Sequence, residues 1–364
     1  MEVNKMLAYI TKVIEHMPQD WLNLTTHRLD IYNEELAKVQ FLDQFVHLAK
    51  EGNSSTAALS NLPTAYDYIR LGHPLSCVLE CAIGNINGLP AEQVISFQSK
   101  TAPILAILRT NLLENRNTLI TYTNELPSAF DIDVLKSIYG FSFDLKKVDS
   151  PADVESFNGS TIFISQQHDS SAISVSSHID FYVSMYADLG SVLLINGAEN
   201  IHYISDIQHF RRRETVAMTP HNCLNALRSL VQLLTENSVT TNTTEHKAAV
   251  LDLIQEVSGS QTTPLVASSG LSVQYTILMG LVHDALENHK GKAIKIVVPP
   301  NCYGGTNDQA RRVAACSDAI EIVDLLVDGD NDMVQSIDYV LEQIAAQDAI
   351  PYIIAEIPTN PRVE

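Results

Sequence analysis

The amino-acid sequence predicts an α/β protein with a mainly parallel sheet flanked by helices and with an internal duplication. Three observations predict this class. From about residue 61 onward, stretches with the periodicity of amphipathic helices alternate with short apolar runs typical of buried strands. Matching stretches recur about 170 to 190 residues further along the chain. Hydrophobic residues make up 45% of the sequence and charged residues 18%, so apolar side chains suffice for a well-buried core.

Residues 1–60 are predicted to form a helical N-terminal arm, which ends in a polar break at 51–56. The apolar residues that carry its helical spacing are Leu7, Ile10, Val13 and Ile14. The rest of the chain divides into a first repeat over residues 61–238 and a second repeat over residues 239–364. The second repeat matches only the N-terminal part of the first.

Each repeat is predicted to begin with an amphipathic helix that ends at a glycine. The glycine is Gly88 in the first repeat and Gly259 in the second, each placed where the left-handed residue that ends a helix belongs. The apolar positions of the two helices are Leu79, Ala82, Ile83 and Ile86, and Val250, Leu253, Ile254 and Val257. A short apolar strand and a small polar loop follow each glycine, at 94–102 and 265–272.

Two further pairs of predicted strands complete the match. Residues 141–148 pair with 319–326, and residues 161–165 pair with 352–356. The separation only grows along the chain, as expected if two related units diverged by insertions in loops. The alternative is that any two α/β stretches share this rhythm, and periodicity alone does not decide between the two interpretations.

The charge balance and the cysteines restrict the class of partner and the compartment. A net charge of -20 argues against nucleic acid and anionic membranes as partners. The N-terminus lacks the basic and apolar regions of a signal peptide, and no apolar stretch is long enough to span a bilayer. The 5 cysteines are odd in number and scattered, which indicates reduced thiols, no zinc site and a cytoplasmic protein.

Three loops at the carboxyl ends of predicted strands in the second repeat carry candidate ligand contacts, and ligands bind at this edge of open α/β sheets. The turn at 268–271 begins a helix, so its backbone N–H groups can bind a phosphate, although tight turns also use serine and glycine for steric reasons alone. The loop at 300–306 places Tyr303 before two glycines, and its ring can cover a flat ligand. The loop at 356–361 offers Asn360 as a polar contact.

In order and spacing, the motifs Ser-Ser-Gly-Leu, Cys-Tyr-Gly-Gly-Thr and Glu-Ile-Pro-Thr-Asn-Pro resemble the Cys/Met-metabolism family of fold-type I pyridoxal-phosphate enzymes. This family includes cystathionine synthases and lyases and methionine γ-lyase. The resemblance covers about residues 245–364. It implies pyridoxal 5′-phosphate (PLP) as cofactor and β- or γ-elimination or γ-replacement on cystathionine-, homoserine- or methionine-like substrates. The cofactor contacts that it implies are the Ser269 hydroxyl and the Gly270 and Leu271 amides on the phosphate, Tyr303 stacked on the ring and Asn360 at the phenolic oxygen.

The first repeat carries one element of this family and departs from others. Its segment Tyr-Ile-Arg-Leu-Gly-His-Pro resembles a family element whose tyrosine and arginine clamp the phosphate of a neighbouring subunit, which implies that role for Tyr68 and Arg70. An ordinary surface turn is the alternative. Lys100 replaces the phosphate-loop glycine, and Glu125 replaces the stacking tyrosine. Gln208 stands at the lysine position of a Ser-x-Thr-Lys-like segment, and glutamine cannot form a Schiff base.

The first repeat is therefore expected to be a degenerate, non-catalytic unit that donates Tyr68 and Arg70 to the second. In the family, the aspartate that pairs with the pyridine nitrogen and the Schiff-base lysine both follow the Asn-Pro motif, and this sequence ends at Glu364 before either. We expect a missing C-terminal segment or a second polypeptide to complete the site, this chain alone being inactive. The other expected partners are an amino-acid substrate and a second copy, unless the repeats form an intramolecular pseudo-dimer. The alternative is a non-catalytic pseudoenzyme that serves as a binding or scaffold protein.

Overall fold

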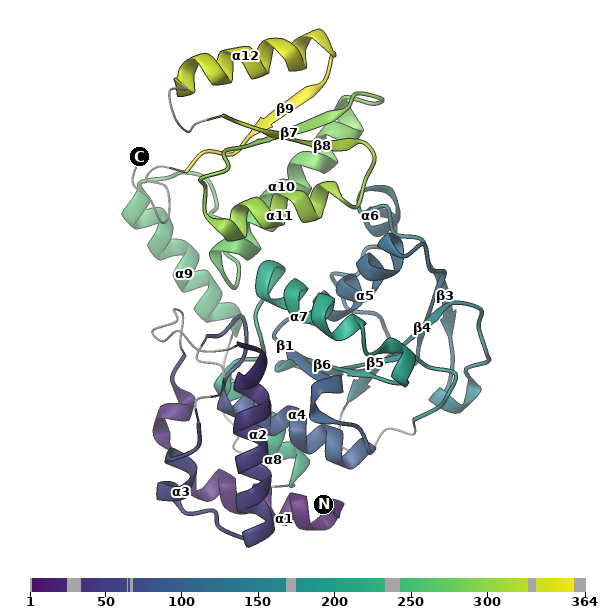
Figure 1. Ribbon diagram of the computed structural model, residues 1–364, viewed down its shortest axis with the longest axis vertical. Coiled ribbons are helices and arrows are strands. Elements are labelled where there is room, and N and C mark those ends of the chain that lie inside the picture. The colour runs from purple at the N-terminus through teal and green to yellow at the C-terminus, as the bar shows by residue number, and fades with distance from the viewer. Residues whose placement is uncertain are drawn as a thin grey trace. The chain divides into compact units, whose positions relative to one another are not determined.

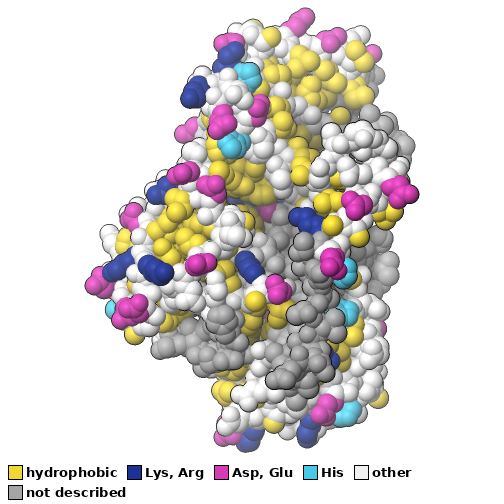
Figure 2. Space-filling view, turned by 180° about the vertical axis from the view of Figure 1, so that it is seen from behind, with side chains coloured by type: hydrophobic (Ala, Val, Ile, Leu, Met, Phe, Trp, Pro, Cys, Tyr) yellow, Lys and Arg dark blue, Asp and Glu magenta, His cyan; other side chains and the backbone are white. Residues whose placement is uncertain are grey.

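The computed structural model describes residues 2–24, 34–63, 65, 68–167, 175–232, 243–326 and 332–356. The chain forms two compact units (Figure 1). The first unit comprises Met1–Asn111, Arg116–Ala129 and Phe143–Val266, and the second comprises Leu112–Asn115, Phe130–Ser142 and Ala267–Glu364. Asp and Glu side chains are scattered over the described parts of the surface drawn in Figure 2, in keeping with the negative net charge. Among the described residues, no helix is long and apolar enough to cross a membrane.

The first unit begins with helices, as the periodicity predicts. They are α1 (Val3–His16), η1 (Gln19–Leu22), α2 (Glu34–Glu51), α3 (Thr56–Ser60) and α4 (Pro74–Asn87). The predicted apolar face of α1 is confirmed, because Ile10 and Val13 are buried and Leu7 and Ile14 pack against the same core. The predicted end of α4 is confirmed too, since Gly88 has the left-handed φ of 69°.

A six-stranded sheet forms the centre of the first unit. Its strands are β1 (Val94–Phe97), β2 (Thr118–Tyr122), β3 (Asp144–Lys147), β4 (Ser160–Gln167), β5 (Phe181–Tyr186) and β6 (Gly190–Ile195). Their order is β1-β6-β5-β4-β2-β3, and β6 alone runs antiparallel to its neighbours. The elements between and after the strands are η2 (Ala91–Gln93), α5 (Ala102–Leu113), η3 (Pro151–Asp153), η4 (Ala198–Asn200), α7 (Tyr203–Glu214), α8 (Pro220–Leu230) and α9 (Thr243–Ser258). β1 and β6 are buried along their whole length, as expected for strands covered on both faces.

The second unit is a smaller three-layered α/β structure. It contains α6 (Ile132–Ser137), α10 (Gly270–Asn288), β7 (Ile294–Val298), α11 (Gly304–Ala314), β8 (Ile320–Asp324), α12 (Met333–Ala346) and β9 (Ile350–Ile353). The strand order is β8-β7-β9, all parallel. Figure 1 shows α12 on one face of this sheet and α10 and α11 on the other. Side chains of β7 alternate accordingly: Ile296 packs with α10 and α11, and Val297 packs with Ile344 of α12.

The strand order and direction β4-β2-β3 of the first unit recur as β9-β7-β8 in the second. The predicted counterpart of β1 is wrong, however, because residues 265–268 form no strand and Leu265 is 77% exposed. In the first unit, β1 exchanges its backbone hydrogen bonds with β6. Among the described residues of the second unit nothing stands in for β6, so a strand at 265 would leave its backbone groups unpaired.

The matching helices of the two repeats also differ in burial. Leu79, Ala82 and Ile83 of α4 are buried. α9 forms as predicted, but its apolar residues Leu253 and Val257 are 58% and 80% exposed. The helical period therefore predicts both helices correctly. It does not predict that the apolar face of α4 is buried in the core of the first unit while that of α9 is exposed.

A buried ion-pair network joins α2, α4, α7 and β1 of the first unit. Glu80 Oε2 accepts from Lys38 Nζ at 2.6 Å, and Oε1 accepts from the Ser96 backbone N–H at 2.8 Å. An Nη atom of Arg211 lies 3.3 Å from Oε1. Burial favours the neutral acid, but the two cations and these hydrogen bonds outweigh it and hold the pKa of Glu80 below its ordinary value.

Candidate cofactor site

The start of α10 presents free backbone donors. Ser269 is the N-cap residue, and its Oγ accepts from the Ser272 backbone N–H at 3.1 Å. The N–H groups of Gly270 and Leu271 have no acceptor among the described residues. A Cβ at Gly270 would meet no atom within 4 Å, so this stretch of backbone is open to a ligand. Because α10 is 19 residues long, its dipole adds a positive potential to these donors.

The ring of Tyr303 lies beside this helix start. Tyr303 is the N-cap residue of α11, and α11 begins with Gly304 and Gly305. A Cβ at Gly305 would stand 2.5 Å from Tyr303 Cε1 and 2.9 Å from Leu271 Cδ1, so only glycine lets the ring and Leu271 come this close. Gln309 Nε2 also donates to the Leu271 carbonyl oxygen at 3.0 Å, which ties α11 to the first turn of α10. The structure thus brings Ser269, Gly270, Leu271 and Tyr303 together, and we call this group the α10–α11 cradle.

Glu356, which the sequence did not single out, fixes the backbone of Tyr303. Its Oε2 accepts from the Tyr303 backbone N–H at 2.8 Å, and its Oε1 accepts from Thr306 Oγ1 at 2.6 Å. The proximity of Glu356 and Tyr303 was open to prediction. Glu356 follows β9 and Tyr303 follows β7, and these two strands are parallel neighbours that end at the same edge of the sheet. A carboxylate there satisfies donors at the positive start of α11.

Asn360 lies outside the described residues.

Cys302, next to Tyr303, is no candidate nucleophile. Burial and the nearby charge of Glu356 both raise the pKa of its thiol, so the unreactive protonated form is favoured at neutral pH.

Tyr68 and Arg70 lie together in a tight turn of the first unit. The Leu71 and Gly72 N–H groups donate to the Tyr68 carbonyl oxygen at 2.7 and 2.9 Å. The Arg70 guanidinium carbon lies 4.6 Å from the centre of the Tyr68 ring, and an Nη atom donates to the Arg212 carbonyl oxygen at 3.2 Å. The side chain of Arg70 is buried within its own unit. Its role as a phosphate clamp stays a prediction.

The residue after this turn, His73, begins α4. Its Nδ1 accepts from the Ser76 backbone N–H at 3.2 Å, and Ser76 Oγ lies 2.9 Å from the His73 backbone nitrogen, which together form a capping box. Since Nδ1 accepts, Nε2 carries the proton and donates to the Met218 carbonyl oxygen at 2.7 Å. Burial lowers the pKa of His73 to about 4, although the hydrogen bond to Met218 opposes that shift.

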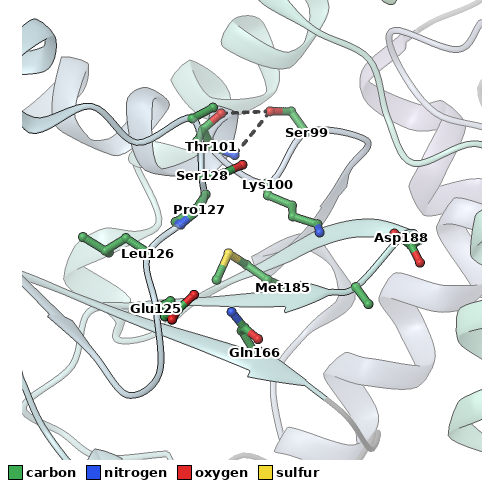
Figure 3. A pocket seen from close by; sticks show the side chains of 12 residues that line it. Ser99, Lys100, Thr101, Glu125, Leu126, Pro127, Ser128, Gln166, Met185 and Asp188 are labelled. Atoms are coloured by element: carbon green, nitrogen blue, oxygen red, sulfur yellow. Dashed lines mark hydrogen bonds between the residues drawn. The ribbon is translucent and has the colours of Figure 1, made fainter. Parts of the chain in front are cut away.

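In the first unit, the segment that matches the α10 turn has one of its two matching donors engaged, since the Thr101 N–H, which corresponds to that of Leu271, has an acceptor. Ser99 Oγ accepts from the N–H groups of Thr101 and Ala102 at 3.3 and 3.1 Å, and Pro103 has no N–H. Lys100 and Glu125, which replace the expected glycine and tyrosine, line one cavity (Figure 3). Backbone N–H groups therefore offer a phosphate fewer donors here than at the start of α10.

The predicted position of Gln208 is wrong. Gln208 lies on α7 and lines a different cavity of the first unit, beside Arg212. The end of β5, with Ala187 and Asp188, reaches the cavity of Lys100 instead. Gln208 follows β6 and η4 in the chain, so it does not lie at the carboxyl end of β5 that reaches the cavity of Lys100.

No family model matches the chain, and no curated protein matches it. Solved structures with a similar fold include metB from Corynebacterium glutamicum, with 12% identity over 67% of this chain and 69% of that chain and a TM-score of 0.35. Cystathionine gamma synthase from Xanthomonas oryzae pv. oryzae, in complex with aminoacrylate and cysteine, has 12% identity over 67% and 68% and a TM-score of 0.33. The metY structure from Campylobacter jejuni, which carries N′-pyridoxyl-lysine-5′-monophosphate, has 14% identity over 62% and 70% and a TM-score of 0.33. These superpositions are loose.

Proposed function

We propose that the second unit binds pyridoxal 5′-phosphate and that the protein acts as a PLP-dependent lyase or transferase on sulfur-containing or γ-substituted amino acids. One observation carries the proposal. The α10–α11 cradle combines two free N–H groups at the start of a long helix with the ring of Tyr303, which can lie beside them because residue 305 is a glycine. The two N–H groups suit a phosphate monoester, and the Tyr303 ring suits a flat aromatic ligand. Both lie at one edge of a parallel sheet.

Each residue of the cradle has a distinct part in holding this cofactor. The Gly270 and Leu271 N–H groups donate to phosphate oxygens. Ser269 caps the helix, and its hydroxyl can donate either to the ligand or to Ser272 Oγ, which lies 2.8 Å away. The Tyr303 ring covers one face of the pyridine ring and excludes water from it. The bound cofactor would supply an electron sink for the substrate α-carbon. Asn360 is proposed to donate to the phenolic oxygen.

The decisive test is Gly270→Pro, which deletes a single donor and preserves the helix. Proline suits the first position of a helix, and Ser269 already has the extended φ of -158° that a residue before proline adopts. Loss of one hydrogen bond to a charged group corresponds to about 1.5–3 kcal/mol. We therefore expect PLP to bind at least about tenfold more weakly in equilibrium dialysis of the full chain, and pyridoxal, which lacks the phosphate, to be unaffected.

Met333→Pro is the matched control for this variant. Met333 is the first residue of α12 in the same unit, it is exposed, and its N-cap residue Asp332 also has extended backbone. This control should bind PLP like the wild type. Equal PLP affinity in Gly270→Pro and Met333→Pro would contradict the cradle.

Tyr68 and Arg70 are proposed to complete the phosphate site. None of the described residues that form the cradle is cationic, and a dianionic phosphate favours an arginine, whose planar fork binds two oxygens. Arg70→Ala should weaken PLP binding about tenfold or more, whereas Arg228→Ala, an exposed arginine of α8, should not. Fluorescence of the buried Trp21 verifies that the first unit stays folded. A folded Arg70→Ala protein with unchanged affinity refutes the clamp.

A non-catalytic binding or scaffold protein is the second candidate, and the first unit favours it. There the N–H of Thr101, which corresponds to that of Leu271, donates to Ser99 Oγ, and Lys100 stands where α10 has Gly270. The two candidates differ in one assay with PLP, made on this chain together with the segment or second polypeptide that is expected to supply the Schiff-base lysine. Release of a keto acid from L-cystathionine supports the enzyme, and PLP binding without turnover of cystathionine, O-acetylhomoserine or methionine supports the scaffold.

A further inference from the structure

We propose that the first unit binds a free α-amino acid in a cavity of its own, separate from the cofactor cradle. The cavity has a volume of about 640 Å³, within the range of pockets that hold small molecules. It lies where β2, β4 and β5 end, beside the loop that follows β1. The chain reverses direction across the sheet between β2 and β4, and such a reversal is where open α/β sheets bind ligands. We call it the first-unit cavity.

The first-unit cavity carries charges of both signs. Lys100 comes from the loop after β1, Glu125 from the loop after β2, and Asp188 from the turn after β5. Figure 3 shows the Lys100 ammonium and the Glu125 carboxylate reaching the cavity from different sides, with Met185 between them. Within the part of the chain that the structure describes, none of these three side chains has a hydrogen bond or ion pair. A ligand with a carboxylate and an ammonium group therefore finds a partner for each.

The helix start beside this cavity argues against a phosphate ligand. Thr101 and Ala102 donate their N–H groups to Ser99, and Pro103 has none, so the Lys100 ammonium is the main partner that this loop offers an anionic group. One ammonium balances one carboxylate, whereas a phosphate dianion would also face Glu125 and Asp188 without compensation. The chemistry of this cavity thus differs from that of the α10–α11 cradle.

The remaining lining selects the side chain of the ligand. Met185 is 3% exposed and forms an apolar floor, flanked by Leu126 and Pro127. Gln166, at the end of β4, adds an amide that can donate and accept. An apolar side chain such as that of methionine fits such a floor, because the flexible thioether of Met185 adapts to varied shapes. The ligand class is therefore an apolar α-amino acid.

The test is isothermal titration of the full chain, freed of PLP, with L-methionine. Two variants each remove one charge while keeping a side chain of similar shape. Lys100→Met removes the partner of the ligand carboxylate, and Glu125→Gln removes a partner of the ligand ammonium group. Each lost charged hydrogen bond should weaken methionine binding about tenfold or more. Lys290→Met and Glu256→Gln change exposed residues outside the cavity and should bind like the wild type. N-acetyl-L-methionine and L-methioninamide each lack one of the two charges and should not bind.

Three outcomes overturn the proposal: no saturable binding of L-methionine up to about 10 mM, binding that both cavity variants retain, or binding of N-acetyl-L-methionine as tight as that of methionine. Because no PLP is present in this titration, its result is independent of the cofactor proposed for the second unit.

Discussion

Glu80→Gln is expected to destabilise the first unit by about 3–5 kcal/mol, because it leaves buried cations without their carboxylate. Lys38 and Arg211 are each only 3% exposed. Because both cations are buried, water cannot solvate them in the variant. The neutral glutamine amide attracts them less strongly than the Glu80 carboxylate does. The measurement is urea unfolding at pH 7, followed by the fluorescence of Trp21, which is the only tryptophan and lies in the core of this unit.

Glu155→Gln is the matched control, since Glu155 pairs with Lys146 at the surface, where its side chain is 84% exposed. Its loss should change the free energy of unfolding by less than about 0.5 kcal/mol. The double variant Lys38→Met/Glu80→Gln should lose less than the sum of the single losses, because it removes a cation together with its counter-charge. Additive losses would show that Lys38 and Glu80 are not coupled, and a Glu80→Gln protein within about 1 kcal/mol of the wild type would show that the network contributes little.

The order of helices and strands could be predicted because it depends on nearby residues. The spacing of Ile10 and Val13 and the glycine at position 88 were sufficient for α1 and for the end of α4. The predicted strands likewise fall on β1, β3, β4, β8 and β9 within a few residues.

The parts that could not be predicted depend on distant segments. Residues 265–268 have the composition of a strand, but a strand needs a neighbour to take its hydrogen bonds. Lys38 and Glu80 are 42 positions apart and meet only because α2 packs on α4. No local pattern distinguishes this pair from surface charges.

The candidate site divides in the same way. The convergence of Ser269 and Tyr303 was predicted from a strand before Ser269 that does not form, and the two meet instead because α10 packs on α11. The hydrogen bond from the Tyr303 backbone to Glu356 required the register of β7 and β9. Gln208 was misplaced because a motif of a few residues says nothing about which strand precedes it.

His73→Asn is expected to invert its effect on stability between pH 7 and pH 4.5. The folded protein holds the pKa of His73 near 4, whereas the unfolded chain has the ordinary value of 6.5. Between these values the unfolded chain binds more protons, so the stability of the wild type falls as the pH falls through this window. The whole shift corresponds to about 3 kcal/mol, most of which is lost by pH 4.5. Lys38 and Arg211 hold the pKa of Glu80 below its ordinary value, which moves the titration of this carboxyl away from the window of His73.

Asparagine also caps helices but cannot take up a proton. At pH 7 the variant should be about 1 kcal/mol less stable than the wild type, since it loses the hydrogen bond from Nε2 to Met218. At pH 4.5 it should be the more stable protein, by about 1–2 kcal/mol. Urea unfolding followed by Trp21 fluorescence at both pH values measures this reversal. His221→Asn, at an exposed histidine of α8, should follow the wild type at both values. Parallel pH profiles for His73→Asn and the wild type would show that His73 is not the group that titrates.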